Sequence, residues 1–120
     1  MEQISAPIAV CETPEFLSRA EKVWSAAERS EFVDFIARNP EAGDLIQGTG
    51  SVRKVRWRKA GVGKSGGVRV IYYFYNETIP LYLVSLFAKN QKSDLSAGDK
   101  QDLAKFVKTV KATARGDFNA

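Results

Sequence analysis

The centre of the sequence, residues 51–75, reads SVRKVRWRKAGVGKSGGVRVIYYFY. Its first part alternates with a period of two, which predicts a β-strand with Lys54 and Arg56 on one face and Val55 and Trp57 on the other. Its last part is rich in β-branched and aromatic residues and predicts a second strand. The glycines between the two parts predict a flexible hairpin connection.

Strand signals continue on the C-terminal side of this segment. Residues 79–88, IPLYLVSLFA, follow a short turn, NET, and predict a third strand. The three strands together predict an antiparallel meander. Beyond them, Ser96-x-x-Asp99 resembles a helix-capping box, and the spacing of Leu103, Phe106, Val107 and Val110 predicts a C-terminal helix with one apolar stripe.

The N-terminal third of the chain predicts two helices in tandem. Thr13-Pro14 is a helix-start signal for a helix over residues 14–23, preceded by a possible short strand at residues 8–11. Ser25-x-x-Glu28 begins a second helix, which Asn39-Pro40 ends. The turn-rich residues 41–51 are interpreted as the crossing from helices to sheet.

Helices, then strands, then a helix indicate an α+β fold with an antiparallel sheet. At 120 residues the chain predicts a single domain, residues 1–120. We expect the C-terminal helix to cover one face of the sheet and the other face to stay open, with the cations on the open face.

The charge is distributed unevenly along the chain. Residues 1–44 hold nine acidic and four basic side chains, whereas residues 45–76 hold no Asp or Glu. The basic residues of that second segment are Arg53, Lys54, Arg56, Arg58, Lys59, Lys64 and Arg69. A surface that gathers them would attract a polyanion, because binding neutralises phosphates and releases their counterions.

Two residue counts exclude whole classes of chemistry. The chain has no His and a single cysteine, Cys11, so we expect no internal disulfide, no metal site and no His-dependent catalysis. No apolar run approaches the roughly 20 residues that span a bilayer, and the N-terminus lacks signal-peptide features. We therefore expect a cytoplasmic protein without a membrane partner.

The glycine-rich segment contains fragments of two nucleotide-binding motifs, Gly61-x-Gly63-x-x-Gly66 and Gly63-Lys64-Ser65. Both motifs require a helix directly after the glycines, whereas a strand is predicted here. The phosphate-loop pattern also needs a glycine where Arg58 stands. No nucleotide cofactor is implied, and Lys64 is interpreted as the tip of a hairpin that reaches a phosphate or is merely solvated.

The segments RKVRWRKAGVGKSGGVRVIYYFY and LYLVSLFAKNQKSDLS resemble the RelE/HigB family of bacterial toxins, in its HigB-like branch. The similarity runs over about residues 39–110. It implies a RelE-like fold and a metal-independent endoribonuclease that cleaves mRNA in the A site of the 30S ribosomal subunit and inhibits translation. It also implies a cognate antitoxin, commonly with a helix-turn-helix domain, and no cofactor.

By this resemblance the catalytic residues are Lys54, Arg56 and Arg69. Lys54 is the candidate general base and the two arginines would bind the developing negative charge, although the Lys and Arg roles stay interchangeable on paper. Further candidates for RNA contacts are Arg53, Arg58, Lys64, Tyr73, Lys89 and Lys92.

The sequence departs from better-known relatives at two places. Lys89 stands where they have an Arg after the last strand, and no Tyr lies near Leu95, where RelE has one at the start of its C-terminal helix. Tyr73 is a substitute by strand alternation, although Tyr72 and Tyr73 also fit the role of core aromatics. The alternative functions are a non-catalytic RNA-binding or regulatory module that uses the same basic face, and a toxin fold that serves only as an interaction protein.

Overall fold

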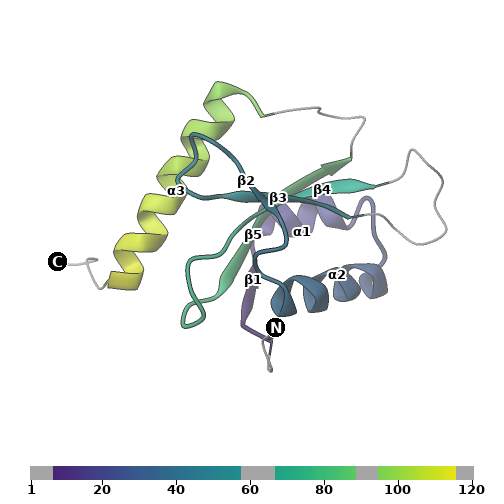
Figure 1. Ribbon diagram of the computed structural model, residues 1–120. Coiled ribbons are helices and arrows are strands. Elements are labelled where there is room, and N and C mark those ends of the chain that lie inside the picture. Colours follow the sequence, from purple (N-terminus) through teal and green to yellow (C-terminus); the bar gives the residue numbers. More distant parts are fainter. Residues whose placement is uncertain (1–6, 58–66, 89–94, 116–120) are drawn as a thin grey trace.

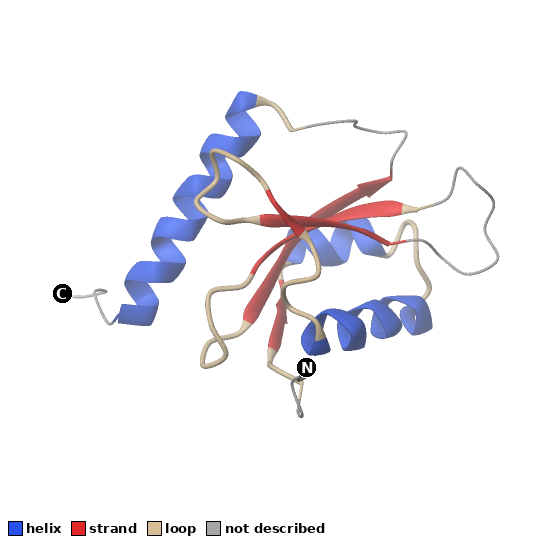
Figure 2. Cartoon of the chain, viewed as in Figure 1, coloured by secondary structure: helices blue, strands red, loops and turns tan. Residues whose placement is uncertain are grey.

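The structure is a computed structural model that describes residues 7–57, 67–88 and 95–115. Within these ranges, helices cover both faces of one five-stranded sheet (Figures 1 and 2). The elements in chain order are β1 (Val10–Glu12), α1 (Pro14–Ala20), α2 (Ala26–Arg38), β2 (Asp44–Leu45), β3 (Arg53–Trp57), β4 (Val68–Tyr73), β5 (Leu81–Ala88) and α3 (Ala97–Arg115). The predicted α+β order is confirmed.

The sheet has the strand order β1-β5-β4-β3-β2. The antiparallel meander of β3, β4 and β5 is present as predicted. The N-terminal strand begins at Val10, two residues later than predicted, and pairs parallel with β5, so the sheet is mixed. The short strand β2 lies within the segment interpreted as a crossing and was not predicted.

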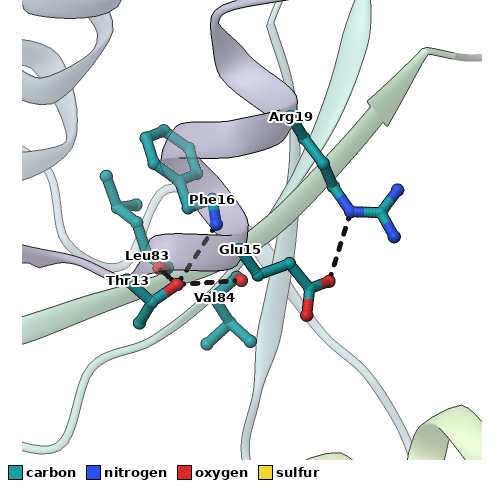
Figure 3. Close-up of polar contacts among 6 residues, drawn as sticks. All are labelled: Thr13, Glu15, Phe16, Arg19, Leu83 and Val84. Atoms are coloured by element: carbon teal, nitrogen blue, oxygen red, sulfur yellow. Dashed lines mark hydrogen bonds and ion pairs between the residues drawn. The ribbon is translucent and has the colours of Figure 1, made fainter.

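Thr13 connects the first helix to the sheet (Figure 3). Its hydroxyl donates to the carbonyl oxygens of Leu83 at 2.8 Å and Val84 at 3.1 Å, and it accepts the N–H of Phe16 at 3.3 Å. The same side chain therefore caps α1 and binds the carbonyl groups of β5 where β1 ends.

The other helix starts also follow their predicted caps. Ser25 and Glu28 form a capping box at α2, and Ser96 and Asp99 exchange the equivalent bonds before α3. The first helix is shorter than the predicted residues 14–23. It ends at Ala20 because the next residues tighten into three-residue hydrogen-bonded turns before Ser25 begins α2.

One hydrophobic core lies between the sheet and helices α1 and α2. Phe16, Phe32 and Ile36 of the helices are fully buried against strand residues such as Val70 and Leu83. Aromatic contacts extend this core to β3, because the ring centroid of Trp57 lies 5.2 Å from that of Phe32 and 4.9 Å from that of Phe35. This packing fixes which face of β3 points inward.

A second core lies on the opposite face of the sheet. The predicted apolar stripe of α3, which includes Leu103, Val107 and Val110, packs on Ile71 and Tyr73. The expectation of an open face carrying the cations is therefore wrong. Apolar residues occupy both faces of β4, so each face of the sheet is covered, and the cations share their face with α3.

At the edge of the sheet, Gly43, just before β2, lies very close to the backbone of β3 and the Tyr72 ring of β4. The Gly43 N–H donates to the Tyr72 hydroxyl at 2.8 Å, and its carbonyl accepts from Arg53 Nη1 at 2.7 Å. A Cβ at this position would lie 2.6 Å from the carbonyl oxygen of Lys54 and 2.9 Å from a ring carbon of Tyr72. Only glycine lets the two strands approach this closely.

We therefore expect Gly43→Ala to lower the free energy of unfolding by about 1–3 kcal/mol, because the added carbon meets backbone that must shift. Urea denaturation of the purified protein measures this change. Gly98→Ala is the matched control, since its Cβ would meet Ser96 Oγ at an ordinary 3.8 Å. That control should be neutral or stabilising by up to about 1 kcal/mol. Equal effects of the two substitutions would contradict the argument.

Candidate nucleic-acid interface

The three predicted catalytic cations lie together on the α3 face of the sheet. Arg56 of β3 is paired directly with Arg69 of β4, and Lys54 is paired with Ile71 two residues further along the same ladder. Because directly paired residues share a face, Lys54, Arg56 and Arg69 form one group, which we call the cation cluster. Arg56 is exposed, and Lys54 and Arg69 are half-buried.

The pair of Arg56 and Arg69 shapes the electrostatics of this cluster. Like charges directly opposite each other destabilise an antiparallel pair, by roughly 0.2–1 kcal/mol on the scale of cross-strand interactions. Within the part of the chain that the structure describes, neither Lys54 nor Arg56 forms an ion pair. An anion that bridges the two guanidinium groups would relieve the repulsion, and phosphate fits their planar forks.

Two other predicted contact residues are placed differently. Arg53 points to the opposite face, where Nη1 donates to the carbonyls of Gly43 at 2.7 Å and Glu41 at 3.3 Å. Tyr73 shares the face of Arg69, as the alternation predicts, but it is only 1% exposed and belongs to the core under α3. We therefore assign structural roles to both and leave them out of the cation cluster.

The remaining candidates fall in other parts of the chain. Arg58, Lys64, Lys89 and Lys92 lie outside the described residues. The glycine-rich connection also lies outside the described residues, except for Gly67, which has a φ of 117° and leads directly into β4. A strand rather than a helix thus follows the glycines, as predicted.

One polar residue beside the cation cluster was missed by sequence reasoning. Asp44 of β2 is the direct antiparallel partner of Lys54. The acid-free segment begins at residue 45, one position later, so the charge count alone excluded this carboxylate. The signal that would have found it is a period of two: Asp44 and the buried Ile46 are two residues apart and share one face, which predicts a strand within the turn-rich segment.

Burial shifts the pKa values of two neighbouring tyrosines of β4. Desolvation raises the pKa of Tyr72 above its ordinary value of 10.0, and the hydrogen bond from Gly43 and the charge of Arg53 oppose this shift. Desolvation also raises the pKa of Tyr73, with a further contribution from Tyr75. Both phenols therefore favour the neutral form, which suits core residues.

With this geometry, two comparisons place the chain among known proteins. A family model described as "RelE toxin of RelE / RelB toxin-antitoxin system" matches residues 25–120, which is most of the chain. This model describes toxins of toxin–antitoxin systems, a class that implies an antitoxin partner. The chain belongs to the RelE toxin family.

A solved structure shows the same fold. It is a double arginine-to-alanine mutant of E. coli toxin RelE in the free state, with 15% sequence identity and a TM-score of 0.53. The match covers 73% of this chain and 90% of that chain.

Two further observations concern the described residues alone. None of their helices combines the length and apolar character needed to cross a bilayer. Their His, Cys, Asp and Glu side chains form no group of three that could hold a metal ion.

The repulsion within the cation cluster predicts a trade-off between stability and RNA binding. We expect Arg56→Met to leave the free energy of unfolding unchanged or raise it by up to about 1 kcal/mol at low salt. The same substitution should weaken binding of single-stranded RNA and reduce the slope of log affinity against log salt by about one. Urea denaturation and fluorescence-anisotropy titrations measure the two effects.

Arg53→Met provides the control from the opposite face of the same strand. It should lower the free energy of unfolding by about 1.5–3 kcal/mol, because the Gly43 carbonyl loses a charged donor. Its effect on RNA affinity should be smaller than that of Arg56→Met. The reverse order of RNA effects would show that Arg53, rather than Arg56, meets the nucleic acid.

The buried tyrosine predicts a pH dependence. In the unfolded chain Tyr72 ionises near pH 10, whereas the folded protein retains its proton to higher pH, so stability falls as pH rises above about 10. Tyr72→Phe cannot titrate and lacks the bond to Gly43, which makes it about 1 kcal/mol less stable below pH 9. Denaturation between pH 8 and 11 should show this difference shrinking above pH 10, and a constant difference would contradict the assignment.

Proposed function

We propose that this protein is a metal-independent endoribonuclease of the HigB-like branch, which cleaves mRNA in the A site of the 30S subunit and so inhibits translation. The single observation that carries the proposal is the cation cluster on a fold of the RelE family. A toxin that acts on RNA needs a surface that holds phosphate, and Arg56 and Arg69 supply one on adjacent strands.

The proposed reaction is attack of a ribose 2′-hydroxyl on the adjacent phosphate. The bond from phosphorus to the 5′-oxygen breaks, which leaves a cyclic 2′,3′-phosphate and a 5′-hydroxyl. Arg56 and Arg69 would bind the phosphoryl oxygens as negative charge develops on them. Their fixed positions on paired strands orient them before the substrate arrives.

Lys54 would act on the same phosphate from the next row of the sheet. From sequence it is the candidate general base, but its ammonium form has three donors and no acceptor. We therefore assign Lys54 to the 5′-oxygen, where it donates the proton that the leaving group needs.

The ribosome and the antitoxin complete the proposal. The ribosome would position the mRNA over the cation cluster. A cognate antitoxin, commonly one with a helix-turn-helix domain, would silence the toxin. The family match supports an antitoxin partner. The ribosome and the helix-turn-helix domain are supported by the resemblance of the strand motifs alone.

Primer extension on a reporter mRNA tests the proposal directly, with the mRNA either free or on translating ribosomes. We expect cuts only in the translated message, and their loss with Lys54→Ala or Arg69→Ala, because each substitution removes a cation from the cluster. Arg38→Ala is the matched control, since it removes one exposed cation from α2, where Arg38 is paired with Asp34 at 3.2 Å.

Three outcomes separate the alternatives. Cuts that persist in both cluster variants would place the active site elsewhere. Salt-dependent RNA binding without any cut, with or without ribosomes, would favour the non-catalytic RNA-binding module. The absence of both binding and cleavage would favour an interaction protein.

A further inference from the structure

Asp44 lies where a carboxylate faces the cation cluster. Two features place it on that face. Asp44 is the direct partner of Lys54 in the antiparallel ladder, and it lies two residues before Ile46, which is buried under α3, so the two side chains point to the same face. Cβ atoms of such direct partners are roughly 5 Å apart. Asp44 is exposed, so its carboxylate is open to a substrate that binds the cluster.

Two other described carboxylates next to the sheet have arginine partners. Glu41 approaches Arg53 on the opposite face, with its carboxylate 4.0 Å from the guanidinium. Glu12 is paired with Arg29 at 3.0 Å. Asp99 and Asp102 of α3 line a cavity of about 220 Å³ on the α3 face, together with Ile71 and Phe87, the ladder partners of Lys54 and Arg69. Asp44 is set apart from these carboxylates by its direct ladder pairing with Lys54.

The pairing of Asp44 with Lys54 is also incomplete. A carboxylate opposite a lysine usually stabilises a sheet through an ion pair, but no such pair within 4.0 Å joins these two side chains in the part of the chain that the structure describes. Neither side chain is therefore occupied by an ion pair with the other. A carboxylate accepts protons and an ammonium donates them.

We propose that Asp44 is the general base of the cleavage reaction; this inference rests on the proposed ribonuclease function. The carboxylate takes the proton of the 2′-hydroxyl as the 2′-oxygen forms its bond to phosphorus. The bond to the 5′-oxygen breaks, and Lys54 gives its proton to that oxygen. Arg56 and Arg69 hold the phosphoryl oxygens. One proton is accepted and one is donated, so the step balances without a metal or co-reactant.

Single-turnover cleavage of translated reporter mRNA, with protein in excess over ribosomes, tests this assignment. Asp44→Asn keeps the shape of the side chain and removes the acceptor charge, and we expect it to slow cleavage by at least about 100-fold. RNA affinity should stay equal or rise, because the substitution removes a negative charge from a surface that binds phosphate. Asp44→Glu, which keeps a carboxylate, should cleave faster than Asp44→Asn.

Glu41→Gln is the matched control, because it removes the same charge three residues away on the opposite face. It should cleave at the wild-type rate. Wild-type rates for Asp44→Asn, a loss shared equally by Glu41→Gln, or a parallel loss of RNA affinity and rate would each overturn the assignment while the proposed function stands. If the wild-type protein itself makes no cut, the proposed function fails and this inference fails with it.

Discussion

The register between β3 and β4 is the constraint on which the rest of the structure depends. Side chains alternate between the two faces of a strand, so a shift of one residue would exchange the faces of every side chain. In the observed register Val55 and Trp57 pack on α1 and α2, while Arg56 meets Arg69 on the α3 face. The shifted pairing would place these cations in an aromatic core, and their desolvation would oppose it. The packing of Val55 and Trp57 on one face therefore determines which side chains form the cation cluster on the other.

The edge strand β2 links stability to the proposed chemistry in the same way. Tyr72 and Arg53 hold the two sides of the Gly43 peptide on the face of the first core. These bonds fix the start of β2 against β3, and one residue further along the chain Asp44 meets Lys54 on the other face. Arg53 and Lys54 are adjacent in sequence and both cationic, but Arg53 donates to backbone carbonyls and approaches Glu41 on one face, whereas Lys54 has Asp44 as a ladder partner on the other.

Much of this arrangement could be predicted from the sequence, because local rules decide it. The capping residues Ser25 and Ser96 and the alternation around Lys54 depend on nearby residues alone, and they identified the helix starts and the common face of the cations. The strand β2 was missed because it has two residues and lies among turn formers. The covered face was misjudged because the apolar stripe of α3 indicates that the helix covers a sheet, but not which face. The uninterrupted run of apolar residues at 70–73 was a signal that both faces of β4 are buried.

The site also combines requirements that oppose each other. Like charges directly opposite each other, as Arg56 and Arg69 are, oppose the pairing of their strands, and a carboxylate such as Asp44 opposes the binding of a polyanion. A surface selected only to bind RNA would separate the two arginines and replace the carboxylate with a neutral or basic residue. A surface that cleaves RNA needs concentrated positive charge at the phosphate and a proton acceptor beside it, and only the bound transition state satisfies both at once. The juxtaposition of a repelling arginine pair with an exposed carboxylate therefore fits catalysis better than binding alone.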